Sequence, residues 1–348
     1  MSDINIRKTG KAGRITFTRP KALNAMSYDM CRAIEEALDL WAEDDEVKMI
    51  VIDAEGDKAF CAGGDIAELY DTGLAKDYAY GQSFWADEYR MNAKMFEFCK
   101  PVASFMQGFT MGGGVGVGCH GSHRVVGDSS QIAMPECGIG LVPDVGGSYI
   151  LARAPGRLGE YLGLTASRLG AGDAIHAGFA DYYIPEAAWP ALIAALEETG
   201  DWQLIDAAAQ PAPTGPLAAL APEIDAAFDG ESLQDVLNTL AATDSDFARE
   251  TLKKLSRNSP LAMGCTLEII HRGRGFSDLR PALGLEYRFT YRAMEHGDFI
   301  EGIRAQIIDK DRNPKWKHAL DALPAVAVSQ MLLPLGDAAL TFEKGEQP

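Results

Sequence analysis

Hydrophobic and polar positions along the first two hundred residues follow two different periods. Short uninterrupted apolar runs, at residues 49–52 and 101–106, are typical of buried β-strands. Between such runs the spacing becomes helical, with apolar residues at every third or fourth position, as at Met30, Ile34, Leu38 and Trp41. Ser27 stands where a side-chain oxygen can cap the first turn of that helix. This alternation predicts a protein of the α/β class.

The pattern changes near residue 207, where the chain becomes rich in alanine and proline. Such a composition, which extends to residue 224, suits a connection better than the interior of an element. Beyond it the periodicity is almost wholly helical. Ser259 followed by Pro260 is a typical helix start, and Asp278 is placed to begin another helix. We therefore expect two parts: residues 1–206, which hold the candidate chemistry, and a helical region over residues 207–348.

Charge and cysteine content narrow the class of protein. The net charge is −18 at neutral pH, and no cluster of lysine and arginine is present that would bind nucleic acid. The six cysteines form no closely spaced pairs, which argues against a zinc knuckle or a disulfide framework. No apolar stretch is long enough to span a bilayer, and the first residues do not resemble a secretory signal. We expect a cytoplasmic protein with no membrane and no nucleic-acid partner.

Residues 134–144 hold the strongest chemical signal. Glu136 and Asp144 lie eight positions apart in a stretch that is otherwise apolar or rich in glycine, with no other charge between them. Burial of an unpaired carboxylate is costly, so an acid in such surroundings needs a reason. Two such groups, with pKa values displaced by apolar neighbours, can perform acid/base or nucleophilic chemistry on an acyl group. Taken alone, the pair would also fit a solvated loop with two surface acids.

Two glycine-rich turns precede this pair. The first covers residues 58–66 and follows the predicted strand at 49–52; the second covers residues 108–116 and follows the strand at 101–106. Backbone N–H groups at such turns can point at an anion, because glycine lets a ligand approach the main chain closely. Two converging N–H groups form an oxyanion hole, which stabilises charge that develops on a carbonyl oxygen. The turns and the acids together favour an enzyme that acts on an acyl group.

Other chemistries find less support in the sequence. Residues 116–121 fit a Gly-x-Gly-x-x-Gly pattern, but no separate strand comes just before them, which disfavours a dinucleotide site. No Gly-x-Ser-x-Gly elbow indicates a serine thioesterase, and no His-Glu-x-x-His pair indicates a metal. Cys61 has no histidine within its motif that would activate it, so a packing role is the better interpretation.

The three segments, taken in order, resemble a known family. Lys-Ala-Phe-Cys-Ala-Gly-Gly-Asp-Ile at 58–66, Met-Gly-Gly-Gly-Val-Gly at 111–116 and Met-Pro-Glu with Pro-Asp-Val-Gly-Gly at 134–147 resemble the crotonase (enoyl-CoA hydratase/isomerase) superfamily. Within it, the chain is most similar to the 3-hydroxyisobutyryl-CoA hydrolases, a similarity carried by residues 298–305 and 309–316. The resemblance implies a crotonase-like spiral of repeated β-β-α units, followed by a helical C-terminal region that covers the site or an interface.

The resemblance also implies roles for single residues. Gly64 and Gly113 would donate their backbone N–H groups to the thioester oxygen of an acyl-CoA. Glu136 would attack the carbonyl carbon or activate water as a general base. Asp144 would bind the 3-hydroxyl of the substrate and assist proton transfer. Two further positions match substrate-binding residues, one of the acyl pocket and one near the nucleotide part of coenzyme A: Glu88 and Lys21.

One position departs from the hydratases of the superfamily. These enzymes use two glutamates to hold the water that adds across a double bond; one corresponds to Glu136, and the other falls on Gly116, which has no side chain. The predicted activity is therefore hydrolysis of a short 3-hydroxyacyl-CoA, with 3-hydroxyisobutyryl-CoA as the best candidate and valine breakdown as the implied pathway. Some isomerases carry an acid near Asp144, so an enoyl-CoA isomerase or hydratase is the enzymatic alternative. A catalytically silent acyl-CoA-binding protein is the alternative of another class.

The predicted chemistry needs no metal and no redox cofactor, since coenzyme A arrives as part of the substrate. The predicted partner is thus a small-molecule acyl-CoA. The resemblance leaves the oligomeric state open. Members of the superfamily often form trimers, so a homo-oligomer is among the expectations, although a helical C-terminal addition can alter it.

Overall fold

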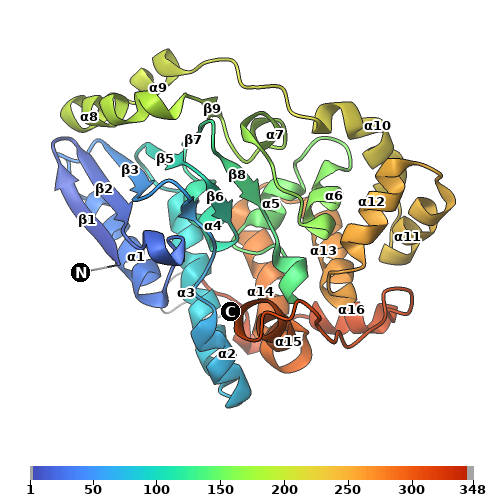
Figure 1. Cartoon of the computed structure of the whole chain (residues 1–348). Helices are drawn as coiled ribbons and strands as arrows, with labels where there is room; N and C mark the ends of the chain where they lie inside the picture. Colours follow the sequence, from blue (N-terminus) through green and yellow to red (C-terminus); the bar gives the residue numbers. More distant parts are fainter. Residues whose placement is uncertain (1–2, 343–348) are drawn as a thin grey trace. The chain divides into compact units, whose positions relative to one another are not determined.

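The computed structural model describes residues 3–342, and the contacts between them divide the chain into two units. Unit 1 combines the chain up to Asp65 with Arg90–Ala133 and Arg168–Ala218. Unit 2 combines Ile66–Tyr89, Met134–Ser167 and the chain from Ala219 onward. Each unit is therefore built from segments that are far apart in the sequence, which can be followed by their colours in Figure 1.

The large sheet of unit 1 has six strands in the order β1–β2–β3–β5–β7–β9. β1 and β2 form an antiparallel pair, and all other neighbours in this sheet are parallel. The two apolar runs of the sequence are β3 and β5, which are adjacent. The bounds of the strands are β1 (Ile4–Thr9), β2 (Ala12–Phe17), β3 (Met49–Ala54), β5 (Val102–Met106), β7 (His123–Val126) and β9 (Tyr182–Tyr183).

A smaller sheet in unit 1 consists of three parallel strands, β4 (Ala59–Cys61), β6 (Phe109–Met111) and β8 (Gln131–Ala133). Each follows a strand of the large sheet after a short connection: β3 leads to β4, β5 to β6 and β7 to β8. A helical segment comes after each pair, beginning with α2 (Ala67–Leu74), α4 (Gly113–Gly118) and the turn η2 (Glu136–Ile139). This order confirms the predicted α/β class with repeated β-β-α units.

The helix predicted after Ser27 is α1 (Tyr28–Ala42). The Ser27 hydroxyl accepts a hydrogen bond of 3.3 Å from the Met30 N–H, as an N-cap residue does. The apolar positions on which the prediction rests are all buried: Met30, Ile34, Leu38 and Trp41. The periodicity of the sequence therefore identified the face of α1 that turns away from solvent.

One face of the large sheet forms the core of unit 1. Val51 of β3 and Phe105 of β5 pack in one buried cluster with side chains of two later helices, α8 (Trp189–Thr199) and α9 (Gln203–Ala208). The rings of Phe105 and Trp189 meet edge to face, with centroids 5.4 Å apart. The remaining elements of unit 1 are α7 (Ala171–His176) and the 3₁₀ turns η1 (Pro20–Ala22) and η3 (Glu186–Ala188).

Unit 2 is helical, and its described residues contain no β-strand. At its centre, α13 (Pro260–Gly273) contacts α5, α6, α11, α14 and α16. Two helices have residues in both units, α3 (Tyr78–Phe96) and α10 (Leu217–Phe228). The other helical elements after η2 are α5 (Gly147–Leu151), α6 (Leu158–Thr165), α11 (Leu233–Ala242), α12 (Asp246–Leu255), α14 (Leu279–His296), α15 (Phe299–Ile303), the π-helical turn η4 (Arg304–Ile308), α16 (Ala325–Met331) and η5 (Gly336–Ala338).

Both helix starts predicted beyond residue 207 are confirmed. The Ser259 hydroxyl caps α13 by accepting from the Ala262 N–H at 3.1 Å. The Asp278 carboxylate caps α14 by accepting from the Leu279 N–H at 2.5 Å. The boundary predicted between residues 206 and 207 divides the chain once, whereas the two units are interleaved in sequence; that boundary stays a prediction.

Two further features concern the chain as a whole. No helix among residues 3–342 combines the length and the apolar character that a membrane span requires. All six cysteines belong to the described residues, and none is in a disulfide. Five of them are buried, whereas Cys99 is exposed.

Candidate active site

Glu136 is the first residue of the turn η2, in unit 2. It is buried, with 5 % of its surface exposed, and its carbonyl oxygen accepts from the Leu141 N–H at 3.0 Å. Its carboxylate oxygen Oε2 is buried and has no hydrogen-bond partner within the described part of the chain. Buried acceptors without a donor are rare in native proteins. This oxygen is therefore available to a water molecule or to a group of a bound substrate.

Asp144 lies in the loop between η2 and α5 and is also buried. The Tyr89 hydroxyl donates a hydrogen bond of 2.7 Å to its Oδ2 atom. Its carbonyl oxygen accepts from the Gly147 N–H at 2.6 Å, so a tight turn follows the residue. The side chain and the backbone of Asp144 are thus both held by unit 2.

Glu88 precedes Tyr89 on α3 and belongs to the same group of acids. It is buried, and its Oε1 atom has no hydrogen-bond partner among residues 3–342. The charge of Asp144 acts directly on the Glu88 carboxyl group. Unit 2 therefore brings together three of the residues that the sequence predicted for the site: Glu88, Glu136 and Asp144.

A fourth buried acid, Glu286 of α14, was not predicted from the sequence. Its carboxylate accepts from the Gly146 N–H at 2.9 Å and from the Ser148 N–H at 3.2 Å, and the Ser148 hydroxyl donates to it as well. The charge of Asp144 acts on Glu286, and the charge of Glu286 acts on Glu136. A signal was present, because Glu286 continues the helical spacing of buried residues along α14, at Leu279, Ala282, Leu283, Phe289 and Ala293.

Burial sets the protonation of these four acids. It raises the pKa of Glu136 and of Glu88 well above the ordinary range of a glutamate, and the negative charge of Asp144 raises both further. Burial raises the pKa of Asp144 to about 7, although the Tyr89 hydroxyl opposes the change by stabilising the anion. Burial raises the pKa of Glu286 to about 8, against the donors at Ser148 and Gly146.

These values have a chemical consequence. Buried acids that repel one another cannot all be ionised near neutral pH, so the group of four shares protons. A carboxyl group whose pKa lies near the working pH can accept a proton in one step and return it in the next. The cluster formed by Glu88, Glu136, Asp144 and Glu286, hereafter the acid cluster, is therefore suited to general acid/base or nucleophilic chemistry.

The two predicted glycine turns lie together in unit 1. Gly64 follows β4 and Gly113 begins α4 after β6, and β4 and β6 are parallel neighbours. The carboxyl ends of parallel neighbours meet at the same edge of a sheet. A Cβ atom on Gly114 would lie 2.2 Å from the Cys61 carbonyl oxygen, so the second turn touches the first and requires glycine there.

The amides of the two turns differ from those of an ordinary sheet. Met26 pairs with Gly64 in a parallel bridge. That bridge uses the Met26 N–H and the Asp65 N–H, at 2.9 and 2.8 Å from their acceptors, so the Gly64 amide takes no part in it. Gly113 is the first residue of α4, where N–H groups have no acceptor within the helix. This geometry suits the oxyanion hole predicted at Gly64 and Gly113, which stays a prediction.

Lys21 lies in η1 of unit 1 and is exposed, so its predicted contact with coenzyme A also stays a prediction. Its neighbours in the sequence have structural roles. The Asn24 side chain donates to the Ala59 carbonyl at 2.8 Å, and Arg19 donates to the Asp65 carboxylate at 3.1 Å. Arg19 and Asn24 thus anchor Asp65 of the first glycine turn and the start of β4.

Side chains from the two segments at residues 298–305 and 309–316 form an ionic cluster in unit 2. Arg304 pairs with Glu301, Asp309 and Asp311 at 2.8, 2.7 and 2.8 Å. The Lys315 N–H donates to Glu301 at 2.6 Å. These contacts fix the path of residues 309–315 beside the end of α15, which is a structural role.

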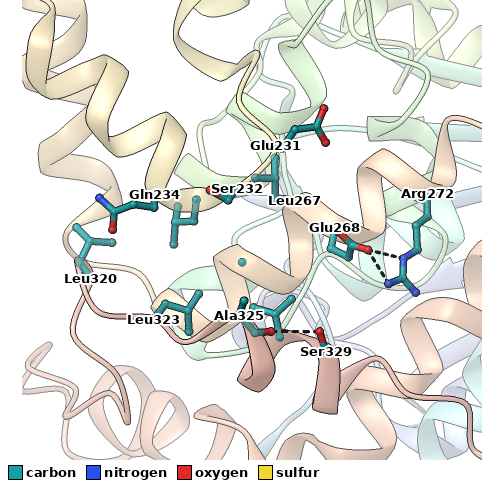
Figure 2. A pocket seen from close by; sticks show the side chains of 13 residues that line it. Glu231, Ser232, Gln234, Leu267, Glu268, Arg272, Leu320, Leu323, Ala325 and Ser329 are labelled. Atoms are coloured by element: carbon teal, nitrogen blue, oxygen red, sulfur yellow. Dashed lines mark hydrogen bonds and ion pairs between the residues drawn. The ribbon is translucent and has the colours of Figure 1, made fainter.

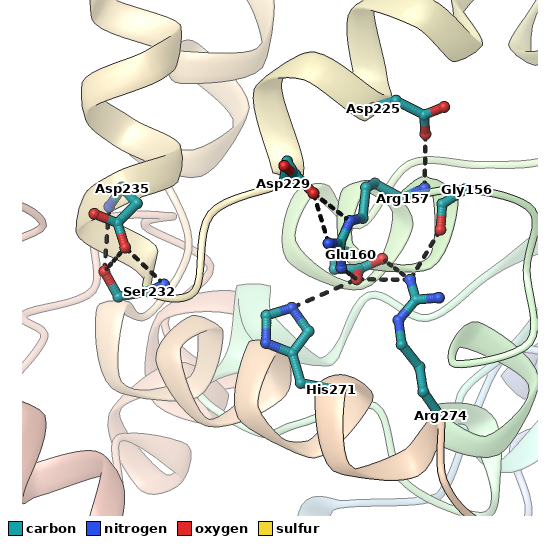
Figure 3. A network of polar contacts seen from close by, with 9 residues as sticks. All are labelled: Gly156, Arg157, Glu160, Asp225, Asp229, Ser232, Asp235, His271 and Arg274. Atoms are coloured by element: carbon teal, nitrogen blue, oxygen red, sulfur yellow. Dashed lines mark hydrogen bonds and ion pairs between the residues drawn. The ribbon is translucent and has the colours of Figure 1, made fainter.

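Another buried carboxylate of unit 2, Glu160 of α6, has cationic side chains as its partners (Figure 3). Its Oε1 atom lies 3.2 Å from Arg157, 2.7 Å from Arg274 and 3.5 Å from His271. Burial raises the pKa of Glu160, but the contact with His271 and the hydrogen bonds from Arg274 outweigh that effect and leave the pKa below its ordinary value. Asp229 accepts from Arg157 at 2.6 Å on the outer side of this network.

A cavity of about 340 Å³ lies elsewhere in unit 2, beside α11, α13 and α16 (Figure 2). Glu268 and Arg272 on its wall pair with each other, and the Ser329 hydroxyl donates to the Ala325 carbonyl at 3.2 Å. Much of the remaining wall is apolar, with Leu267, Leu320 and Leu323. The acid cluster is not among the described residues that line this cavity, so the candidate chemistry does not belong to it.

A model of the enoyl-CoA hydratase/isomerase family matches residues 12–332, and the chain belongs to this family. Two curated relatives within it are 3-hydroxyisobutyryl-CoA hydrolases. The one from Xenopus tropicalis is 39 % identical over 90 % of this chain and 84 % of the relative. The one from Homo sapiens is 36 % identical over 91 % of this chain and 84 % of the relative.

Two solved structures are similar along nearly the whole chain. A crystal structure of an enoyl-CoA hydratase from Rhodobacter sphaeroides shares 58 % identity at a TM-score of 0.95, covering 98 % of this chain and 100 % of that one. A crystal structure of a carnitinyl-CoA dehydratase from Mycobacterium thermoresistibile shares 38 % identity at a TM-score of 0.94, covering 99 % and 100 %. Both likenesses confirm the predicted crotonase-like fold. The names of these structures and of the curated relatives describe different reactions.

The prediction of a cytoplasmic location is wrong by this comparison, because the Xenopus and human hydrolases are named as mitochondrial proteins. The prediction rested on cysteines that indicate no disulfide framework and on the lack of an apolar secretory or membrane-spanning stretch. Neither property distinguishes the cytosol from mitochondria, because mitochondrial import uses an amphipathic, arginine-rich segment.

Proposed function

We propose that the protein hydrolyses the thioester of a short 3-hydroxyacyl-CoA, and that its substrate is 3-hydroxyisobutyryl-CoA, an intermediate of valine breakdown. The observation that carries the proposal is the presence in one unit of two buried acids, Glu136 and Asp144, with the charge of Asp144 raising the pKa of Glu136 beyond the effect of burial. The names of the curated relatives, which cover most of the chain, support the same reaction.

In the proposed reaction the Gly64 and Gly113 amides donate to the thioester oxygen as it becomes negative. Glu136 either attacks the carbonyl carbon, giving a transient anhydride, or takes a proton from the attacking water. In both routes the carbon–sulfur bond breaks and the sulfur of coenzyme A receives a proton. In the general-base route the oxygen of water ends on the acyl product; in the anhydride route it ends on the acyl product or, where water attacks the glutamyl carbon, in the Glu136 carboxylate. A glutamate with a raised pKa is a stronger base than an ordinary carboxylate, which favours either role.

The other acids would recognise the substrate. Asp144 would accept a hydrogen bond from the 3-hydroxyl, with its remaining oxygen held by Tyr89. Glu88, whose Oε1 has no partner among the described residues, would contact the acyl group from α3. Lys21 would meet a phosphate of the nucleotide part. The scheme needs no metal or redox cofactor, because every step is a proton transfer or an acyl transfer.

The alternative reaction, hydration of an enoyl-CoA, is favoured by the name of the Rhodobacter structure. It requires a second glutamate on the helix after the triple glycine. That position is Gly116, a buried residue of α4 that has no side chain to move a proton. Asp144 provides a second acid at another place, which suits an isomerase better than a hydratase. Hydrolysis agrees both with the missing side chain at Gly116 and with the added acid at Asp144.

The test measures release of free thiol from 3-hydroxyisobutyryl-CoA, 3-hydroxypropionyl-CoA and crotonyl-CoA, with the enoyl absorbance followed in parallel. We expect thiol release that is fastest with the first substrate and lost in Glu136→Gln. Glu160→Gln is the matched control, since it removes a buried carboxylate of the same unit that lies in a different network. A change in enoyl absorbance without thiol would point to a hydratase or isomerase. Micromolar binding of coenzyme A without turnover would point to a silent binding protein.

A further inference from the structure

The loop that carries Asp144 has an unfavourable backbone. Val145, a β-branched residue, has φ +51°, and Gly146 after it has φ +79°. Left-handed conformations are rare for branched side chains, and they persist only where the surrounding structure enforces them. Since Val145 directly follows Asp144, whatever enforces this turn also sets the direction of the Asp144 side chain.

Glu286 makes the contacts that can enforce it. One oxygen of its carboxylate accepts from the Gly146 N–H, and the other accepts from the N–H and the hydroxyl of Ser148. Glu286 and Ser148 are almost completely buried, so water cannot replace these donors. Three hydrogen bonds from the residues just after Val145 therefore converge on one side chain that is 140 positions away in the sequence from Gly146.

The same face of α14 also contacts Tyr89, whose hydroxyl donates to the Asp144 carboxylate. Thr290 lies one turn after Glu286 on α14, and its hydroxyl oxygen is 3.3 Å from the Tyr89 hydroxyl. Tyr89 in turn donates to Asp144. One face of α14 therefore holds Asp144 in two ways. Glu286 holds the backbone of its loop, and Thr290 contacts Tyr89, which donates to its carboxylate.

We propose that Glu286 is a positioning residue for Asp144: it holds the strained turn at Val145 and Gly146 and thereby aims the Asp144 carboxylate at the 3-hydroxyl of the substrate. The inference deepens the proposed function and rests on it. Glu160, by contrast, is held by cationic side chains that lie outside the loop of Asp144. The donors to Glu286 are instead two backbone amides and one hydroxyl, all of the loop that Asp144 begins.

The test compares hydrolysis of 3-hydroxyisobutyryl-CoA with hydrolysis of isobutyryl-CoA, which lacks the hydroxyl. In Glu286→Gln one carboxylate oxygen becomes an amide group that cannot accept from a backbone N–H. A small displacement of a binding group is enough to cost about a hundredfold in rate. We expect kcat/KM for the hydroxylated substrate to fall by roughly tenfold to a hundredfold, and that for isobutyryl-CoA to change much less.

Two further variants separate positioning from general stability. Ser148→Ala removes one donor from the loop side and should reduce the preference for the hydroxylated substrate in the same direction, by a smaller factor. Glu160→Gln should lower Tm and leave the preference unchanged. A double-mutant cycle completes the test: in the Asp144→Asn background, Glu286→Gln should have little further effect on the preference, because the residue that it positions has already lost its charge.

The outcomes are distinguishable from one another. An unchanged preference in a folded, active Glu286→Gln variant would overturn the positioning role and leave the proposed function standing. Equal slowing of both substrates with a lower Tm would also overturn it, since that is the pattern of a structural residue. Additive effects of Glu286→Gln and Asp144→Asn would do the same. No thiol release by the wild type would overturn the proposed function, and this role for Glu286 with it.

Discussion

Unit 2 contains two groups of buried carboxylates, and they differ in what surrounds them. Glu160 is held by Arg157, Arg274 and His271, and its pKa lies below the ordinary value. The acid cluster has hydroxyl and amide donors or no donor at all, and its pKa values are raised. A buried carboxyl group therefore stays ionised in the Glu160 network, whereas the carboxyl groups of the acid cluster hold protons near neutral pH. The difference lies in the partners, since burial is common to both.

The comparison also separates stability from chemistry. Removal of one partner from a buried ion pair typically costs about 3–5 kcal/mol of stability. Breaking the Glu160 network should therefore destabilise the folded state. The acid cluster has the opposite effect on stability, because ionisation of its buried members destabilises the folded state. A group of residues that opposes folding and is nevertheless retained in the core is a candidate for function.

The largest expected effect is on turnover, which should be lost in a variant of the acid cluster and kept in a variant of the Glu160 network. Glu136→Gln keeps the size of the side chain but removes the base and nucleophile, so we expect kcat for hydrolysis to fall on the order of a thousandfold or more. Binding of coenzyme A thioesters, measured by calorimetry, should persist. Glu160→Gln should keep most of the turnover. Most of the wild-type kcat remaining in Glu136→Gln would contradict the assignment of that residue.

The next effect concerns Asp144. If it accepts the 3-hydroxyl, Asp144→Asn should slow hydrolysis of 3-hydroxyisobutyryl-CoA about a hundredfold more than that of isobutyryl-CoA, because a buried acceptor matched to a hydroxyl discriminates strongly. The ratio of the two kcat/KM values measures this directly. Equal slowing of both substrates would assign Asp144 to the chemical step.

Hydrolysis in oxygen-18 water over a single turnover tests the role of Glu136, because an anhydride cleaved at the acyl carbon of the enzyme leaves the heavy oxygen in that carboxylate.

The third prediction concerns how stability depends on pH, and here the two groups should behave oppositely. Asp144 has an ordinary pKa of 3.8 when unfolded and about 7 when folded, so the native state binds more protons between those values. Stability due to this group is present at low pH and is lost as pH rises towards 7. A tenfold change in proton affinity corresponds to about 1.4 kcal/mol. Asp144→Asn should therefore raise Tm by several degrees at pH 8 relative to the wild type, and much less at pH 4.

Glu160 should show the opposite sign. Its folded pKa is lowered, so its contribution to stability is present above the ordinary value of 4.5 and is lost as pH falls through the folded pKa. Glu160→Gln should lower Tm at pH 7 by several degrees, and the difference from the wild type should shrink towards pH 3. Thermal unfolding of both variants between pH 3 and 8 is the measurement. Parallel curves for the two variants would contradict the comparison.

The smallest expected effect is at Gly116. Gly116→Glu restores a glutamate where hydratases have one, but hydration needs water between two carboxylates with matched protonation. In the proposed reaction Asp144 would be a third acid and would disturb that match. We expect no efficient hydration of crotonyl-CoA by this variant or by the wild type, as followed by enoyl absorbance. Robust hydration by the unmodified protein would show that the interpretation of Gly116 is wrong.

Much of the fold could be predicted because its signals are local. The runs that became β3 and β5, the cap at Ser27 and the helix start at Ser259 each depend on a few neighbouring residues. The smaller sheet could not be predicted in the same way. Its strands, such as β4 (Ala59–Cys61), have three residues each, which is too short to show a period, and their pairing joins distant segments.

The candidate site shows the same limit. Glu136 and Asp144 stood out because a charge among apolar residues is visible within one short segment. Tyr89 and Glu286 did not, since an aromatic residue and an acid on a helix are ordinary in a sequence. Their importance depends on contacts across 55 and 140 positions, from Tyr89 to Asp144 and from Gly146 to Glu286. Only the tertiary structure brings those partners together.

The distribution of the cysteines has a practical consequence for spectroscopy. Burial raises the pKa of the Cys119 and Cys137 thiols to about 12, so neither forms a reactive thiolate at neutral pH. Among the six cysteines, all within the described residues, Cys99 is the exposed one. A maleimide dye or spin label should therefore attach at one position of unit 1 in the unmodified chain. Because Cys99 is not a member of the acid cluster, labelling leaves the side chains of the cluster unchanged.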